Sequence, residues 1–111
     1  MVSFNQAPHT ANAILASLPP AEIERLLPDF EILVSKHGQI LQEPGEFMDS
    51  VYFPLVGMIS MLTVLEDGES IEAATIGAEG MANVQVFLGT QKAPSRVVTQ
   101  LTGRFLRMKT E

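Results

Sequence analysis

The chain has 111 residues and a mass of 12.1 kDa, which is enough for one domain and too little for two. Hydrophobic residues make up 46% and charged residues 18%, so the chain can bury a core and is not a disordered polyelectrolyte. The absence of cysteine excludes a disulfide framework, a thiolate zinc site and an iron–sulfur cluster. The sequence has neither a bilayer-spanning apolar stretch nor a signal peptide, so we expect a cytoplasmic protein without membrane contact.

Charge is divided unevenly along the chain. Residues 1–79 carry 12 acidic and 2 basic residues, whereas residues 80–111 carry 1 acidic and 5 basic residues. The overall net charge of −6 argues against direct binding of DNA by this chain, because duplex affinity depends mostly on phosphate neutralisation. The basic last third suits a small anion site, although solvated faces of strands explain the same charges.

Two short helices are predicted after a polar arm over residues 1–11. Residues 12–18 place apolar side chains at helical spacing, and a proline pair ends this segment. Residues 21–27 repeat that spacing, and Pro20 suits the first turn because its missing N–H has no partner there. Pro28 breaks this second helix.

From residue 30 onward the helical spacing gives way to the alternation of strands. Residues 30–35 alternate in polarity, and Gly38 turns the chain into a short strand at residues 39–41. Residues 43–46 (Glu-Pro-Gly-Glu) predict a turn, because proline presets φ and glycine accepts a positive φ.

The middle of the chain predicts three more strands. Residues 51–55 and 58–65 form two of them, and Pro54 restricts the first to an edge, an end or a bulge. Residues 66–69 contain the Asp-Gly signal of a hairpin, and residues 70–76 form the returning strand.

A short helix is predicted over residues 81–88, with Gly89 as its C-cap. A polar loop at residues 90–95 then leads to strands at 96–101 and 104–108, which are separated by a predicted turn at Thr102 and Gly103. Many short strands with few short helices indicate a mainly β fold, a small barrel or jelly roll.

The sequence offers few residues suited to catalysis or metal binding. His9 and His37 are the only histidines, and both fall in segments predicted to be irregular, so they do not supply a metal site or a nucleophilic triad. Most carboxylates fall in turns or on polar strand faces rather than in a dry pocket. The sequence therefore does not favour an enzyme and indicates no cofactor.

The segment after the last hairpin is the most informative. Gly77 and Gly80 lead out of a strand toward the predicted helix, and such a junction offers backbone N–H groups to an anion. Arg96 is the first residue of the next predicted strand, and its guanidinium can bind the same anion with two parallel hydrogen bonds. A plain strand–turn–helix connection explains this spacing as well.

Several linked motifs follow one another at fixed distances. They are LQEPGE at residues 41–46, VYFPLVGMIS at 51–60, EDGESIE at 66–72 and IGAEGM at 76–81, preceded by LPPAEIERL at 18–26. Together they resemble the N-terminal sensor domain of Crp/Fnr-type bacterial transcription regulators. The resemblance implies a cyclic-nucleotide-binding-like β-roll, a jelly roll with short flanking helices, over residues 12–111.

The resemblance also implies where a ligand would bind. The expected ligand-binding residues are Gly77, Glu79, Gly80, Met81, Ala82, Arg96 and Val97. In members that bind cyclic nucleotides, a glutamate after the glycine takes the ribose and an arginine takes the phosphate. Here Met81 follows Gly80 and Val97 follows Arg96, so we expect the phosphate partner to be retained and the ribose partner lost. The expected effector is a phosphate-containing small molecule that is not cyclic AMP bound in the usual way.

Members of this family continue into a long dimerisation helix and a helix-turn-helix, and neither element is present in this sequence. We expect an effector-sensing regulatory domain whose parent protein forms a homodimer and reaches DNA through that missing part. The alternatives are a stand-alone cyclic-nucleotide-binding-like or degenerate protein-interaction module without DNA-binding activity, and a cupin-like enzyme on a similar jelly roll.

Overall fold

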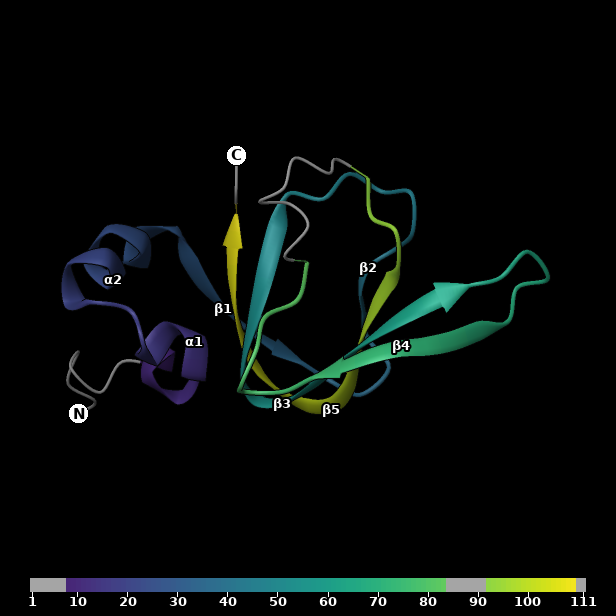
Figure 1. Cartoon of the computed structure of the whole chain (residues 1–111). Coiled ribbons are helices and arrows are strands. Elements are labelled where there is room, and N and C mark those ends of the chain that lie inside the picture. The colour runs from purple at the N-terminus through teal and green to yellow at the C-terminus, as the bar shows by residue number, and fades with distance from the viewer. Residues whose placement is uncertain (1–7, 84–91, 110–111) are drawn as a thin grey trace.

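The computed structural model describes residues 8–83 and 92–109. Its elements in chain order are η2 (Pro8–Ala11), α1 (Ala13–Ala16), α2 (Pro20–Leu26), η3 (Leu27–Asp29), β1 (Phe30–Ser35), β2 (Ile40–Gln42), β3 (Ser50–Val64), β4 (Ser70–Ile76) and β5 (Arg96–Lys109). Helices gather at one end of the molecule and the β3–β4 hairpin projects at the other (Figure 1).

Local sequence signals account for both predicted helices. The Asn12 side chain accepts hydrogen bonds from the backbone N–H groups of Ile14 and Leu15, so it is the N-cap of α1. Pro20 occupies the first turn of α2, where a missing N–H costs nothing. The last four residues of the predicted arm form η2, and residues 1–7 lie outside the described residues.

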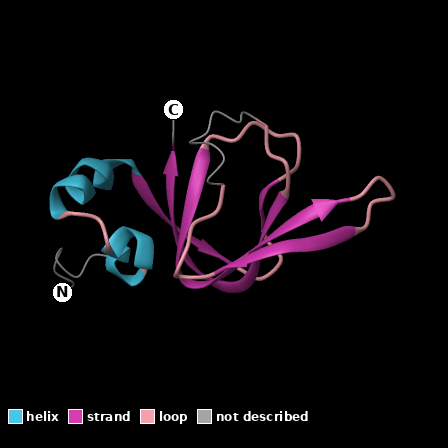
Figure 2. Ribbon diagram, viewed as in Figure 1, coloured by secondary structure: helices cyan, strands magenta, loops and turns pink. Residues whose placement is uncertain are grey.

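The described strands form one antiparallel sheet in the order β1-β5-β3-β4, with β2 pairing separately with β5. Figure 2 shows this sheet bending into a roll, with the helices packed beside it. The predicted mainly β architecture with short flanking helices is therefore confirmed. The predicted turns at residues 43–46 and 66–69 are present, with Gly45 and Gly68 at φ of 85° and 90°.

The division of the long strands was predicted wrongly. Residues 50–64 form one strand where two were expected, and residues 96–109 likewise form one strand without a turn. The register between β3 and β5 shifts at Pro54/Val56 and again at Val56/Met58, so bulges absorb the proline and glycine without ending the strand. Long-range pairing outweighs the local breaking signals here.

The predicted helix over residues 81–88 is wrong at its start. Ala82 forms an isolated antiparallel bridge with Tyr52, and each backbone N–H donates to the carbonyl of the other. Extended pairing of this kind is incompatible with a helix beginning at Met81. The rest of that prediction, including the cap at Gly89 and the start of the loop at residues 90–95, lies outside the described residues.

Two hydrophobic clusters occupy opposite faces of the sheet. Leu106 and Met108 of β5 pack with Leu15 and Ile23 from the helices, whereas Phe105 lies inside the roll with Tyr52. This division follows from the alternation of side chains along a strand. Because β3 and β5 contribute to both clusters, they form the central framework of the molecule.

Candidate functional site

The predicted anion-binding turn follows β4 directly. The Gly80 N–H donates to the Gly77 carbonyl at 3.1 Å, which closes a turn over residues 77–80. The Gly77 N–H donates to Oε2 of Glu79 at 3.2 Å, so a carboxylate from the same turn accepts the first of these backbone donors. Glu79 therefore stabilises the turn from within, in the manner expected of an anion at such donors.

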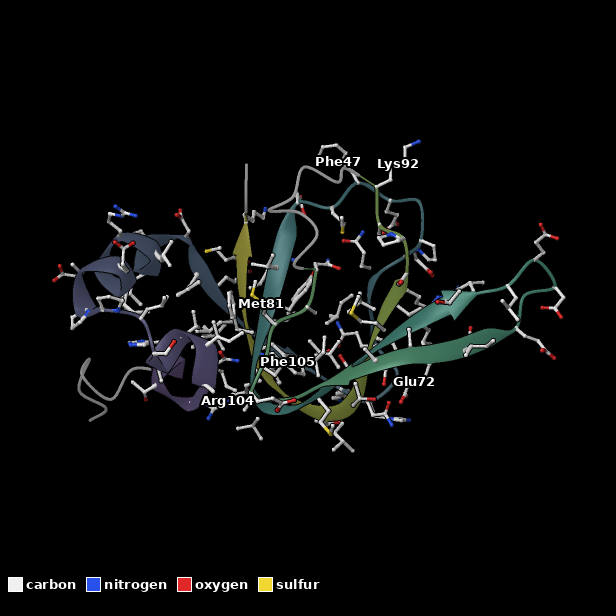
Figure 3. The ribbon with its side chains drawn as sticks, in the orientation of Figure 1. Phe47, Glu72, Met81, Lys92, Arg104 and Phe105 are labelled. Atoms are coloured by element: carbon white, nitrogen blue, oxygen red, sulfur yellow. The ribbon has the colours of Figure 1, made fainter. Side chains whose placement is uncertain are left out.

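The next two predicted residues have packing roles. Met81 lies against the hydrophobic cluster that joins the helices to the sheet (Figure 3). Ala82 is fully buried in the cluster inside the roll and is held there by its bridge to Tyr52. A methionine thioether is a weak hydrogen-bond acceptor, so neither side chain offers a partner for a sugar hydroxyl.

Arg96 opens β5 at the far end of the roll from the helices. Its Nε donates to Oε1 of Glu43 at 2.7 Å, in an ion pair whose side chains are 31% and 37% exposed. The antiparallel β2–β5 register explains the contact: Gln42 lies opposite Val97, so Glu43, the residue after Gln42, lies next to Arg96, the residue before Val97. Val97 itself is fully buried in the cluster inside the roll.

The sheet register separates Arg96 from the Gly77–Gly80 turn. Ile76, the residue before the turn, lies opposite Ile59 of β3, whereas Arg96 lies opposite Leu62. Three residues of strand correspond to about 10 Å along the sheet. The structure thus places the seven predicted residues in two groups, one around the turn and one at the start of β5, and the described contacts do not join them.

Sequence reasoning missed Glu43 as the partner of Arg96, and it read Asn12 only as the beginning of a helix. Beyond capping α1, the buried Asn12 side chain donates from Nδ2 to the carbonyls of Pro54 at 2.8 Å and Gly80 at 2.9 Å. Asparagine is a common N-cap, so the first role was readable from the sequence. The other contacts span 42 and 68 residues, and nothing local signals them.

A polar cluster joins the strands near Glu43. Asn83, at a φ of 69°, donates from Nδ2 to the carbonyl of Ser50 and to Oε1 of Gln42. Gln42 in turn donates to Oε1 of Glu46. The positive φ of a buried non-glycine residue is a strained arrangement that its side-chain hydrogen bonds hold in place.

Neither histidine belongs to a site of this kind. His37 is exposed, and its Nδ1 lies 2.6 Å from the carbonyl oxygen of Gln100. His9 lies beside a cavity of about 510 Å³ that is lined mainly by α1 and α2, and none of the seven predicted ligand residues lines it. Among the described residues, no group of three or more histidine, aspartate or glutamate side chains is arranged to hold a metal ion.

Comparison with known proteins places this geometry in a family. The family model described as the cyclic nucleotide-binding domain matches residues 33–111. The chain belongs to this family. Among curated proteins, no sequence matches this chain.

Solved structures share the fold of this cyclic nucleotide-binding domain. The sensor domain of the transcriptional regulator DNR from Pseudomonas aeruginosa is similar with a TM-score of 0.79 at 14% identity, over 95% of this chain and 71% of that one. The catabolite activator protein of Thermus thermophilus gives a TM-score of 0.72 at 16% identity, over 93% of this chain and 46% of that one. The predicted resemblance to Crp/Fnr-type sensor domains is confirmed at the level of the fold.

The same fold occurs outside transcription regulators. The regulatory subunit of a cAMP-independent protein kinase A from Trypanosoma brucei has a TM-score of 0.82 at 18% identity, over 96% of this chain and 39% of that one. This domain thus spans less than half of the Thermus and Trypanosoma chains.

In the described part of the chain, no helix combines the length and apolar character needed to cross a membrane.

Proposed function

We propose that the chain is the effector-sensing domain of a Crp/Fnr-like transcription regulator. The observation that carries the proposal is the family match over residues 33–111. The sensor domain of Pseudomonas DNR, with the same fold, supports the regulatory role. On this proposal the domain is not an enzyme and acts in the cytoplasm, and its parent protein is a homodimer that binds DNA through a part outside this chain.

The proposed effector is a small molecule that carries a phosphate and binds at Arg96, with Val97 beside it. The turn formed by Gly77, Glu79 and Gly80, together with Met81 and Ala82, forms the second part of the proposed site. Neither Met81 nor Val97 has a polar group for a ribose, so the usual mode of cyclic AMP binding is disfavoured. A fold of this kind also occurs in a kinase regulatory subunit described as cAMP-independent, which supports the same conclusion.

A second function, a protein-interaction module, has one specific observation in its favour. Val34 of β1 and Val56 of β3 flank Arg104 of β5 across the sheet, and the two valines are 66% and 53% exposed. Ile32, on the same face of β1 as Val34, is 50% exposed. Apolar side chains gathered on one face of a sheet are typical of a surface that a partner covers.

Thermal unfolding in the presence of candidate effectors tests the sensing proposal. The protein is heated alone and with millimolar cyclic AMP, cyclic GMP or a panel of other phosphates. A specific ligand present at about 100 times its Kd stabilises the folded state by about 2.7 kcal/mol, which raises the midpoint measurably. We expect a midpoint shift with a phosphate-bearing ligand other than the cyclic nucleotides, and its loss in Arg96→Ala.

The outcomes separate the two functions. A ligand that stabilises wild-type protein and Arg96→Ala equally would contradict the assignment of Arg96 while leaving a sensor in place. The absence of any shift across the panel would favour the interaction module. In that case Val34→Ser should weaken the capture of a partner, because the exposed face loses apolar area.

A further inference from the structure

Glu43 is held at Arg96 by the backbone around it. The Glu46 N–H donates to the Glu43 carbonyl at 3.2 Å, and the Glu43 N–H donates to Oε1 of Glu46 at 3.1 Å. This turn is also bonded to the segment leading into β5, since Gly45 donates to the Ala93 carbonyl and Ala93 donates to the Glu46 carbonyl, both at 2.8 Å. The carboxylate of Glu43 therefore reaches the guanidinium from a fixed position close to it.

The contact resembles the binding of an anionic ligand by arginine. Its 2.7 Å distance is that of a charge-assisted hydrogen bond, and it involves Nε, one of the donors that the guanidinium presents to a phosphate. A phosphate approaching the remaining edge of Arg96 would lie next to the negative charge of Glu43. Like charges in such proximity repel, so a free phosphate has to displace Glu43 rather than bind beside it.

Other charged groups near this end of the roll do not remove the conflict. Glu46 adds a second carboxylate to the same turn, and it accepts hydrogen bonds from Gln42 and from the Glu43 backbone. Lys92 is exposed and forms a backbone bridge with Phe47, which lies beside it in Figure 3. In the described residues Arg96 is thus the cation that faces Glu43, and the pair carries no net charge.

We propose that Glu43 is the specificity-determining residue of the Arg96 site. Its carboxylate occupies the anion position on Arg96, so the site excludes simple phosphates and accepts only an effector whose other groups supply the binding energy needed to displace Glu43. This inference rests on the proposed ligand site at Arg96 and names the feature that selects among phosphate-bearing ligands. Removal of the carboxylate converts the site into a general anion site.

The test follows the Arg96 Nε–H signal by NMR while inorganic phosphate is added at constant ionic strength. Wild-type protein is compared with Glu43→Gln and with Glu66→Gln, which makes the same change in net charge on the exposed β3–β4 turn. Arg96→Lys in the Glu43→Gln background identifies the signal and the site. We expect Glu43→Gln to bind phosphate roughly fivefold more tightly than wild type, as expected for an ion pair whose side chains are 31% and 37% exposed. Wild type and Glu66→Gln should respond alike and weakly.

Two results would overturn the inference. One is a wild-type Arg96 signal that responds to phosphate as strongly as that of Glu43→Gln, and the other is a Glu43→Gln signal that responds no more than wild type. If Glu43→Gln does not give a spectrum of folded protein, Glu43→Asp makes the same test, because the shortened side chain withdraws the carboxylate from Arg96.

Failure of the inference and failure of the proposed function can be told apart. A gain of phosphate binding in Glu43→Gln, without any effector that stabilises the wild-type protein, would uphold the role of Glu43 and count against sensing. An effector that stabilises the wild-type protein, with no gain of phosphate binding in Glu43→Gln, would uphold sensing and count against the role of Glu43.

Discussion

Tyr52 is the residue whose ionisation is most clearly coupled to folding. Its side chain is buried in the cluster inside the roll, and its hydroxyl donates to the Leu41 carbonyl at 3.3 Å. Burial raises the pKa of Tyr52 above its ordinary value, and this effect outweighs the opposing influence of Arg107. Arg107 forms an ion pair with Glu31 at 2.6 Å, which raises the pKa of the arginine itself.

The direction of the shift predicts a loss of stability in alkali. Tyr52 keeps its proton to a higher pH in the folded chain than in the unfolded one. Its contribution to the free energy of unfolding is therefore complete below the unfolded pKa of about 10 and is lost as the pH rises through the folded pKa. Because Tyr52 is the only tyrosine and tryptophan is absent, tyrosinate absorbance reports this group alone.

We expect the folded protein to titrate at higher pH than the same protein in urea. Urea denaturation at a series of alkaline pH values should also show a smaller decline of stability in Tyr52→Phe than in wild type. Equal titration midpoints in the folded and unfolded chains would contradict the prediction.

At the scale of elements, the crossing of β3 and β5 depends on two glycines. A Cβ built on Gly103 would collide with the Val56 carbonyl oxygen, and one built on Gly57 would lie 2.6 Å from that of Leu101. Both neighbours are backbone atoms, so neither can move aside cheaply. These glycines allow two long strands to approach each other where the sheet bends.

Gly103→Ala should therefore be among the most destabilising single changes in the chain. We expect a loss of about 3 kcal/mol or more in the free energy of unfolding, measured by urea denaturation, because the backbone has to separate. Gly68→Ala is the matched control, since its Cβ would meet open space and only its φ of 90° is unfavourable. That control should lose about 1 kcal/mol. Similar losses in the two variants would refute the close approach as the cause.

At the scale of the whole molecule, Asn12 links the helices, the sheet and the proposed ligand turn. Its Oδ1 caps α1, and its Nδ2 bonds to Pro54 of β3 and to Gly80. The Ala13 N–H adds a bond to the Ala78 carbonyl at 2.7 Å. The helical end of the molecule is thereby attached to the turn over residues 77–80. This turn contains three of the proposed ligand residues, and two more follow it directly.

Asn12→Asp tests this attachment, because aspartate is an equally good helix cap but lacks the two side-chain donors. The carboxylate would face two carbonyl oxygens in a fully buried position. We expect the free energy of unfolding to fall by more than about 2 kcal/mol, with faster amide exchange in residues 78–82. Ser17→Ala removes an exposed hydroxyl bond to the Ile14 carbonyl and should change stability by less than about 0.5 kcal/mol. Unchanged exchange in residues 78–82 would show that Asn12 does not hold the turn.

The sequence by itself determined the features that depend on neighbours along the chain. Asn12 and Pro20 begin helices, and Gly45 and Gly68 form turns, because each requires only a local backbone conformation. The motifs around these turns were specific enough to indicate the β-roll and its family. These signals involve only residues close together in the sequence, so they can be recognised without the tertiary structure.

Only the tertiary structure decided strand continuity and the contacts of the site. Pro54 and Gly103 read locally as breaks, yet pairing with strands distant in the sequence carries the chain through both positions. Glu43 meets Arg96 across 53 residues because β2 pairs with β5. The registers of β4 and β5 on β3 keep Arg96 away from the Gly77–Gly80 turn. For strands far apart in the sequence, the register depends on which faces of both strands are buried together, so the pattern of one strand alone does not specify it.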